Sequence, residues 1–563
     1  MMKVGKKYNR RTLFRMKQFY NVFSDEKVSP LATQLTFIVL FIYIKCIFWY
    51  NVIGVDSMEK IVDIANKINL DNIELYGNYK AKINYNYENN NKNGKLILVT
   101  STNPTPYGEG KTTLSIGLSD SLNKIGKKSI VVLREPSLGP VFGSKGGACG
   151  GGLAKVVPEL DINLHFNGDF HAITSANNLL CSIIDNHIYE GNSLNIDKVV
   201  FNRCIDINDR SLRNININER LEHFDITPAS EIMAILCLSK NIYDLKEKLG
   251  NIIVGYTKDL KEVYAKDLKC VDALTILLKD AIKPNLVGTL YGNPAIIHGG
   301  PFANIAHGCN SIIGTLTALK LSDYVITEAG FGSDEGALKF FDIKCRLNNI
   351  YPDVVIINTT IKSLKYNGNN DLEKGIENLK FHIENMKKFN DNVIVSLNKF
   401  DDDSNFEIEF VKEYVEKLDT KFVISTMYKD GEYGCISLAN LILNLENTKK
   451  YYIYDLKDSL KTKIEKVCNH LGCSEVIYSE EALSKLNNIN KDYPICIAKT
   501  PFSITDDKNK LGYPKNFKMK VTDIKVLNGA GFIVIYMGNI LTMPGLSKNA
   551  NYLNMNINDI ISK

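Results

Sequence analysis

Residues 95–133 decide the fold, and they read KLILVTSTNPTPYGEGKTTLSIGLSDSLNKIGKKSIVVL. The apolar runs at 95–101 and 127–133 contain β-branched residues and predict two buried strands. Between them, apolar residues recur every three or four positions, as one face of a helix requires: Leu114, Leu118, Leu122 and Ile125. Gly126 is suited to end that helix. The order of strand, loop, helix and strand predicts a βαβ unit that opens a parallel sheet.

The loop of this unit carries a phosphate-binding pattern, GEGKT at 108–112. Its backbone N–H groups and the positive end of the helix would face an anion. Lys111 would reach the terminal phosphates, and the hydroxyl of Thr112 would bind Mg²⁺. Thr105 stands where many such loops have a further glycine, yet the residues that contact phosphate are kept. We therefore predict a nucleotide site made by Thr105, Pro106, Tyr107, Gly108, Glu109, Gly110, Lys111, Thr112 and Thr113.

Arg134 and Glu135 directly follow the second strand. Ligands of parallel sheets collect at the carboxyl ends of the strands, so Arg134 should lie beside the phosphate loop if the two strands are near neighbours. Its guanidinium offers a fork of donors to a phosphate or a carboxylate. The alternative, an ion pair with Glu135 or another carboxylate, stays open at this point.

A second motif suggests a GTPase. The strand expected at 391–397 is followed by Asn398, Lys399, Phe400 and Asp401, which match the guanine-reading pattern Asn-Lys-x-Asp. A GTPase also needs Asp-x-x-Gly to sense the γ-phosphate, and no aspartate in the chain has a glycine three residues later. The short match alone therefore does not indicate a GTPase, because the second motif that a GTPase needs is missing.

Composition excludes several classes of protein. The chain has 563 residues, a net charge of +5 and twelve cysteines with no Cys-x-x-Cys pair. A disulfide framework or a zinc knuckle would need closer pairing. No basic stripe interleaved with aromatic residues runs through the body of the chain, so we expect no nucleic-acid partner.

Residues 1–57 form an extension that is basic and then apolar. The segment 31–55 approaches the ~20 apolar residues that span a bilayer, although Lys45 interrupts it. It would be the only membrane contact of the chain. In the alternative, translation starts at Met58, where an amphipathic pattern begins. Both interpretations stay open.

Longer segments resemble one family, formate–tetrahydrofolate ligase, also called 10-formyltetrahydrofolate synthetase. They include TPYGEGKTT at 105–113, REPSLGPVFGSKGGACGGG at 134–152, HGGPFANIAHGCNS at 298–311 and TEAGFGSDEGALKFFDIKCR at 327–346. The resemblance runs from about Met58 to the end of the chain and implies the monofunctional form. It implies that formate, ATP and tetrahydrofolate give 10-formyltetrahydrofolate, ADP and phosphate through formyl phosphate, a reaction of one-carbon metabolism.

The reaction and the surrounding motifs suggest roles for single residues. Lys111 and Arg134 would hold ATP and formyl phosphate. Asp169 would take the proton of the attacking amine, with capping of the following helix as the alternative. Glu328 would lie near Mg²⁺, or would be an ordinary carboxylate at a helix start. His298 and His307 would serve packing or a close backbone approach to a ligand.

On the folate side, the resemblance implies that Phe400 stacks on the pterin ring. Met427 stands where the family has the tryptophan of the opposite face, and Tyr428 is the next aromatic residue. A methionine can lie against a ring but gives up stacking area, so Met427 would weaken folate binding. Lys362 and Asn367 also replace an arginine and a histidine of the family pattern.

Taken together, we expect an α/β protein with a large P-loop NTPase-like parallel-sheet domain at 58–350. A folate-side α/β domain at 351–460 and a C-terminal domain at 461–563 would follow. The resemblance further implies a homotetramer, a monovalent cation (K⁺ or NH₄⁺), tetrahydrofolate with or without a polyglutamate tail, and a cytoplasmic enzyme. A membrane-anchored or organellar location is the alternative for the extension. Two other functions stay open, a membrane-tethered regulatory ATPase or GTPase and a degenerate ligase that binds nucleotide without forming product.

Overall fold

The computed structural model describes residues 58–84, 94–106, 108–144, 147–217, 220–445 and 450–557. The chain divides into two units, Met1–Met58 and Glu59–Lys563, and the elements below belong to the second. The apolar segment at 31–55 and Tyr107 of the phosphate loop lie outside the described residues. In the described ranges, no helix has the length and apolar character that a membrane span requires.

A large, mostly parallel sheet organises the described chain, and twelve of the described strands belong to it. Ten of them lie side by side in the order β1 (Ile73–Leu75), β2 (Ala81–Ile83), β14 (Asn285–Thr289), β15 (Pro294–Ile297), β4 (Ser129–Leu133), β16 (Tyr324–Glu328), β3 (Lys95–Ser101), β17 (Val354–Thr359), β18 (Val393–Asn398) and β19 (Lys421–Ser425). All neighbours from β15 to β19 are parallel. The pairs at the other edge are antiparallel, including β6 (Ala154–Val157) on β14 and β5 (Gly150–Gly151) on β6. The prediction of an α/β protein with a large parallel sheet is confirmed in this mostly parallel form.

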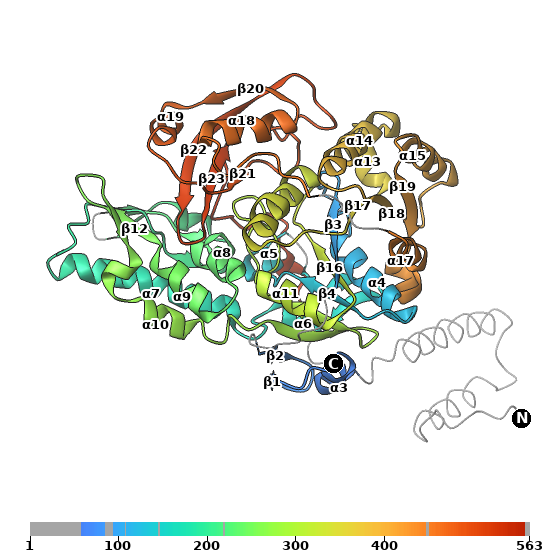
Figure 1. Ribbon diagram of the computed structural model, residues 1–563, viewed down its shortest axis with the longest axis horizontal. Helices are drawn as coiled ribbons and strands as arrows, with labels where there is room; N and C mark the ends of the chain where they lie inside the picture. The colour runs from blue at the N-terminus through green and yellow to red at the C-terminus, as the bar shows by residue number, and fades with distance from the viewer. Residues whose placement is uncertain are drawn as a thin grey trace, which may run out of the picture. The chain divides into compact units, whose positions relative to one another are not determined.

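Side chains of β3 alternate between two cores on opposite faces of the sheet. Leu96 and Leu98 belong to one core, and Ile97 and Val99 belong to the other, as the two-residue repeat of a strand requires. Helices α11 (Ile312–Leu321) and α14 (Leu372–Phe389) contribute to the first core, whereas α4 (Lys111–Lys124) and α17 (Ile436–Leu443) contribute to the second (Figure 1). Burial on both faces explains why this strand is an unbroken apolar run.

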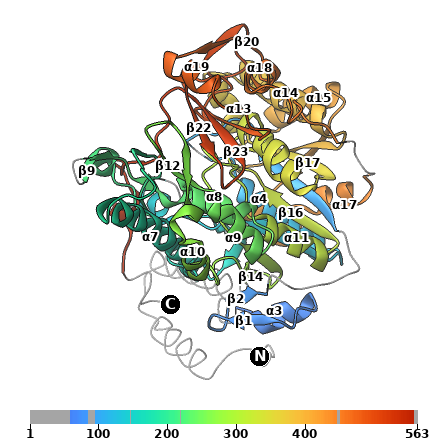
Figure 2. The same cartoon turned by 60° about the vertical axis from the view of Figure 1, so that its left-hand side comes forward.

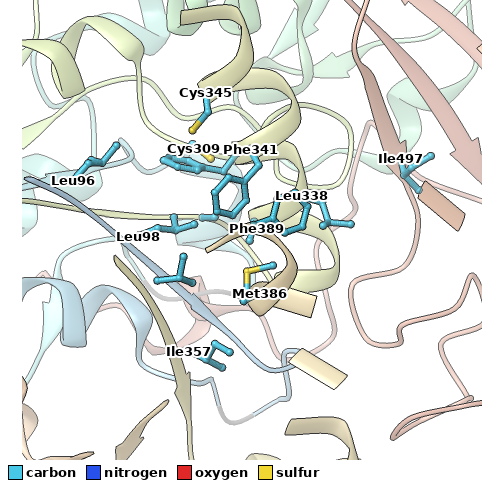
Figure 3. Packing of buried hydrophobic residues seen from close by; sticks show 14 of the residues in the cluster. Leu96, Leu98, Cys309, Leu338, Phe341, Cys345, Ile357, Met386, Phe389 and Ile497 are labelled. Carbon is cyan, nitrogen blue, oxygen red and sulfur yellow. The ribbon is translucent and has the colours of Figure 1, made fainter. Parts of the chain in front are cut away.

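The first core also reaches the C-terminal part of the chain. Phe341 and Phe389 stack at its centre with ring centroids 4.5 Å apart and planes 12° apart. Figure 3 shows these two rings side by side, with Leu98 and Met386 around them. Ile497 belongs to the same core and lies on β21 (Ile495–Ala498), one strand of a separate sheet. That sheet has the order β20 (Cys473–Tyr478), β22 (Phe517–Leu527), β23 (Phe532–Met537), β21, and α18 (Leu460–His470) and α19 (Glu480–Leu486) accompany it.

A third core is mainly helical and lies beside the large sheet. Helices α7 (Asp169–Tyr189), α8 (Glu231–Leu238), α9 (Ile242–Gly250) and α10 (Val271–Leu277) bury their apolar faces in it (Figure 2). A small sheet accompanies them, with the order β13 (Glu262–Tyr264), β12 (Ile253–Tyr256), β7 (Lys198–Val199). Two further pairs are β8 (Cys204–Ile205) with β11 (Asp225–Ile226) and β9 (Ile215–Ile217) with β10 (Arg220–Glu222). The other α-helices are α3 (Ile61–Lys67), α5 (Leu138–Phe142), α6 (Glu159–Asn163), α12 (Arg346–Asn348), α13 (Ile361–Asn367), α15 (Asn405–Lys417) and α16 (Met427–Asp430).

The opening βαβ unit forms much as the sequence predicts, with one difference that matters for the site. Strand β3 covers 95–101, helix α4 ends at Lys124, and Gly126 has a left-handed φ of 81°. However, β16 lies between β3 and β4, so the phosphate loop and Arg134 are separated by one strand. The strands predicted for 351–460 lie in the same sheet as β3. The division of the chain at 350 and 460 stays a prediction, because a shared sheet does not show which parts fold independently.

Candidate active site

The phosphate loop joins β3 to α4 through two glycines in left-handed conformation. Gly108 has φ 75° and Gly110 has φ 77°, backbone angles that favour glycine. A Cβ atom at Gly110 would lie 2.7 Å from Nδ2 of Asn398, which follows from the close approach of β18. The backbone N–H of Thr105 donates to Oε1 of Glu109 at 2.6 Å, and the side chain of Asn358 donates to the Glu109 carbonyl. The loop is thus closed on itself, bonded to the end of β17 and packed against the end of β18.

Lys111 begins α4 and lies along the loop. Its Nζ donates to Oγ of Ser101 at 2.9 Å and lies 3.9 Å from the carboxylate of Glu109. Burial lowers the pKa of Lys111, while the nearby carboxylates of Glu109 and Glu328 act in the opposite direction. An ammonium group that is partly desolvated in this way gains from a phosphate chain placed beside it.

Thr112 and Glu328 form a hydrogen-bonded pair of oxygen-bearing side chains beside the loop. The hydroxyl of Thr112 donates to Oε2 of Glu328 at 2.9 Å, and Glu328 is the last residue of β16. One hydroxyl and one carboxylate fit Mg²⁺, because this ion usually takes few protein ligands and completes its shell with phosphate oxygens and water. Within the described residues, no group of three or more His, Cys, Asp or Glu side chains could hold a metal ion without such help.

Arg134 follows β4 and presents a free guanidinium. Among the residues that the structure describes, it forms no ion pair, and its buried Nε has no hydrogen-bond partner. A Cβ atom at Gly330 would lie 3.0 Å from Nη1 and 3.2 Å from Nη2, so the guanidinium lies against the bare backbone of that glycine. The alternative of an ion pair with Glu135 is therefore wrong. An unpaired guanidinium at a strand end has the donors that a phosphate or a carboxylate would need.

Phe400 lies in the loop after β18 and is 38% exposed. Nζ of Lys362 lies 4.9 Å from the centroid of its ring and 3.0 Å from the carboxylate of Asp402. The ammonium group of Lys362 makes a cation–π contact with one face of the Phe400 ring. An exposed ring supported in this way is suited to stacking on a flat ligand.

Met427 does not lie where the stacking prediction requires it. Its side chain is fully buried in the core of α4, and a Cβ atom at Gly117 would lie 2.4 Å from the Met427 Cβ. Because Gly117 leaves room on α4, the first residue of α16 points into the core. The role of Met427 in folate stacking is therefore corrected.

Tyr428 supplies an aromatic ring at this position instead. It is 62% exposed, and a Cβ atom at Gly151 would lie 3.2 Å from its ring. Lys429 and Asp401 form an ion pair at 3.0 Å that links helix α16, which carries Tyr428, to the loop of Phe400. The two exposed rings thus follow two adjacent parallel strands, Phe400 in the loop after β18 and Tyr428 on helix α16 after β19.

A model of the family described as formate–tetrahydrofolate ligase matches residues 51–562 of the chain. The chain belongs to this family. The formate–tetrahydrofolate ligase of Campylobacter concisus (strain 13826) is 52% identical over 530 residues, which cover 89% of this chain and 96% of that protein. The protein of the same name from Campylobacter curvus (strain 525.92) is 51% identical over 532 residues, with the same two shares covered, 89% and 96%. The predicted resemblance is confirmed.

Asp169 of this family member lies in a buried cluster with Lys82 and Asn285. Its two carboxylate oxygens accept from Nζ of Lys82 at 2.5 Å and from Nδ2 of Asn285 at 2.8 Å. Burial raises the pKa of Glu135 well above its usual range, and the neighbouring Asp169 adds to this rise. Asp169 is the first residue of α7, yet no side chain caps that helix at Gly168. Its role as proton acceptor stays a prediction, and the ion pair with Lys82 disfavours it.

The family signature at 298–311 places two histidines differently. His298 is buried with Nδ1 2.6 Å from Oγ of Ser311 and Nε2 2.7 Å from the carbonyl oxygen of Ala281. This imidazole is fully hydrogen-bonded and has a packing role. His307 is equally buried, but neither of its ring nitrogens has a hydrogen-bond partner in the described chain.

Sequence reasoning missed three further residues of the site. Asn358, which donates to the phosphate loop, and Asn398, which lies against Gly110, are in the last residues of β17 and β18. The strand-end argument that selected Arg134 also applies to them. Lys82 had no such signal, because a lone lysine in a short strand usually faces solvent.

Proposed function

We propose that this chain ligates formate to tetrahydrofolate with consumption of ATP, and that formyl phosphate is the intermediate. The observation that carries the proposal is the free guanidinium of Arg134, one strand away from the phosphate loop. A phosphate loop alone would support any nucleotide-dependent reaction. A second anion site beside it favours transfer of the γ-phosphoryl group to a small carboxylate.

The proposal includes a P-loop NTPase-like site that binds ATP. The loop amides at 108–113 and Lys111 would hold the phosphate chain, at the positive end of α4. Thr112 and Glu328 would hold Mg²⁺, which supplies charge neutralisation for the phosphates when it is bound. Because phosphoryl transfer depends on position and charge, these groups need no covalent role.

Activation of formate is the first chemical step. Formate is a poor acyl donor, because its leaving group would be an oxide. One formate oxygen attacks the γ-phosphorus, the bond to ADP breaks, and ADP leaves with the electron pair. Arg134 offsets the charge that the formate carboxylate brings to the phosphates. The product, formyl phosphate, has phosphate as a good leaving group.

Transfer to tetrahydrofolate is the second step. The N10 amine attacks the formyl carbon, and the bond between that carbon and the phosphate oxygen breaks. The amine proton ends on the released phosphate dianion, so the step balances without a protein base. Phe400 and Tyr428 would hold the pterin ring, since both are exposed and the segments that carry them are linked by the ion pair of Lys429 and Asp401.

The proposal also includes features that come from the family resemblance. These are a homotetramer, a monovalent cation (K⁺ or NH₄⁺) and tetrahydrofolate with or without a polyglutamate tail. Light scattering of the purified chain measures the first, and assays in potassium, ammonium and tetramethylammonium salts measure the second. A monomer, or full activity in tetramethylammonium, would contradict the respective feature.

The direct test is product formation by the full chain with ATP, formate and tetrahydrofolate. We expect 10-formyltetrahydrofolate, and we expect Lys111→Ala to abolish it without changing the circular dichroism spectrum. ATP turnover that ignores formate and tetrahydrofolate would favour a regulatory ATPase. ATP binding without product at saturating folate would identify a degenerate ligase and overturn the proposal.

A further inference from the structure

Two buried histidines in one loop differ in a way that points to a ligand. His298 makes two hydrogen bonds, as buried imidazoles usually do. His307 is 0% exposed, yet its Nδ1 and Nε2 both lack a hydrogen-bond partner among the described residues. An unsatisfied buried polar group costs stability, so its presence in a native protein calls for an explanation, such as a bound substrate.

The backbone next to His307 pairs with the segment that packs against Arg134. The N–H of Gly330 donates to the carbonyl of Gly308 at 3.0 Å, and Cys309 forms a β-bridge with Ala329. Gly330 in turn lies against the guanidinium of Arg134, whose buried Nε is also without a partner. The guanidinium of Arg134 and the imidazole of His307 thus each have a buried nitrogen without a hydrogen-bond partner. Both residues adjoin the paired segments 307–309 and 329–330.

The surroundings keep His307 neutral. Burial lowers the pKa of His307 to about 3, and the positive charges of Lys344, Arg134 and Lys339 add to this effect. Lys344 is itself fully buried and donates to Asn310 and Thr315 at 2.8 and 2.9 Å. A neutral imidazole carries one N–H donor and one acceptor nitrogen, so it can bind a carbonyl oxygen without exchanging a proton.

We propose that His307 is a catalytic residue that donates a hydrogen bond to the formyl oxygen, beside the phosphate bound by Arg134. The inference rests on the proposed function and assigns a further residue to it. In formyl phosphate, one oxygen bridges to phosphorus and the other is the carbonyl oxygen. Arg134 binds the phosphate side, and His307 binds the carbonyl side.

The hydrogen bond would strengthen during transfer to the amine. As N10 attacks, the carbonyl oxygen becomes an oxyanion, and a donor placed for it in a water-excluded site stabilises this charge. The C–O bond to phosphate then breaks, the carbonyl re-forms, and the amine proton ends on the released phosphate. His307 gains and loses no proton in this sequence.

The test compares His307→Leu, His307→Gln and the control His298→Gln in the full chain. For His307→Leu we expect kcat to fall about 100- to 1,000-fold, the loss typical of one oxyanion donor. The KM for formate rises, while the Kd for ATP, measured by calorimetry, stays within about twofold. His307→Gln retains part of the rate because its amide also has an N–H donor.

Stability separates this role from a structural one. Replacing an unsatisfied buried group by an apolar one is neutral or stabilising, so His307→Leu should keep or raise the apparent melting temperature. The control His298→Gln loses hydrogen bonds and should lower it, with an unchanged KM for formate. A lower melting temperature and wild-type kinetics for His307→Leu would overturn the inference.

The pH profile gives an independent check. A neutral donor leaves no imidazole limb between about pH 5 and 8 in kcat/KM. A limb in the wild type that disappears in His307→Gln would make His307 a proton carrier and contradict the inference. If the wild type forms no product at all, the proposed function fails, and the inference fails with it.

Discussion

The proposed nucleotide side and the proposed folate side of the site differ in the groups that would hold the ligand. On the nucleotide side, backbone N–H groups and left-handed glycines form the loop, and Lys111, Thr112, Glu328 and Arg134 surround it. On the folate side, binding would depend on the faces of two side chains, Phe400 and Tyr428. The ligand-binding roles of the first set stay predictions. On the folate side the predicted role of Met427 is wrong, because its side chain is fully buried.

The difference indicates which kind of binding site keeps its function when a neighbouring residue is replaced. A loop that binds through its backbone keeps its shape as long as the glycines and the strand ends remain. A stacking face can shift to the next residue when a helix begins one position earlier or later. The following changes, from the largest expected effect to the smallest, separate these two modes.

Arg134→Ala should have the largest effect on the nucleotide side. Removing a guanidinium that neutralises charge in phosphoryl transfer should lower kcat/KM for formate by at least about 1,000-fold. ATP binding and the apparent melting temperature should stay near wild type, because Arg134 pairs with no described side chain. Arg134→Lys serves as the matched variant and should recover part of the rate. Near-full activity of Arg134→Ala would refute the assignment.

Met427→Ala should act on stability and not on folate. Deleting a fully buried methionine leaves a cavity beside Gly117, which should cost about 2–5 kcal/mol in the free energy of unfolding. Denaturant titration measures this cost, and the KM for tetrahydrofolate should stay unchanged. A raised KM with unchanged stability would restore Met427 as a stacking residue.

Tyr428→Ala should show the reverse pattern. The loss of one stacking face should raise the KM for tetrahydrofolate roughly three- to tenfold, with little change in stability because the ring is 62% exposed. Phe400→Ala should give a similar rise, and Tyr428→Phe should restore the wild-type value. The KM values for ATP and formate serve as internal controls. An unchanged folate KM in both alanine variants would place the pterin elsewhere.

Ionisation of Asp120 on α4 should have a smaller effect, on the pH dependence of the stability of the fold. Burial raises the pKa of Asp120 to about 7, and its Oδ1 accepts from Thr289 and Asn293. The folded state therefore holds this proton more tightly than the unfolded state. The stability that Asp120 contributes is complete below about pH 4 and is lost as the pH rises through 7.

Asp120→Asn cannot ionise, so it should remove this dependence. The melting temperature of the wild type minus that of Asp120→Asn should fall by a few degrees between pH 5 and 8. Asp206 and Glu231 also have pKa values raised to about 7 by burial, but they remain in both proteins and cancel in the difference. A constant difference across this range would show that Asp120 does not titrate there.

Much of the fold was predictable because its signals are local. The apolar run at 95–101, the helical repeat that follows and the left-handed Gly126 all arise from short-range geometry. The position of Arg134 at a strand end was predictable for the same reason. The insertion of β16 between β3 and β4 was not, since strand order depends on packing between segments about 200 residues apart.

The remaining parts of the site depend on burial and partners, which single residues do not reveal. Phe400 was assigned from its family pattern, and its exposure agrees with that assignment. Met427 and Tyr428 are adjacent in sequence, and only the open space at Gly117 decides which of them points inward. Likewise, His298 and His307 occupy one signature, and only their hydrogen-bond partners tell them apart.

The path of the formate oxygens tests the central claim most directly. Formate labelled with heavy oxygen is supplied with ATP and tetrahydrofolate, and the released phosphate is analysed by mass spectrometry. If formate attacks the γ-phosphorus, its bridging oxygen stays with phosphorus, and each phosphate should carry one labelled oxygen per turnover. Unlabelled phosphate together with labelled 10-formyltetrahydrofolate would contradict a formyl phosphate intermediate at Arg134.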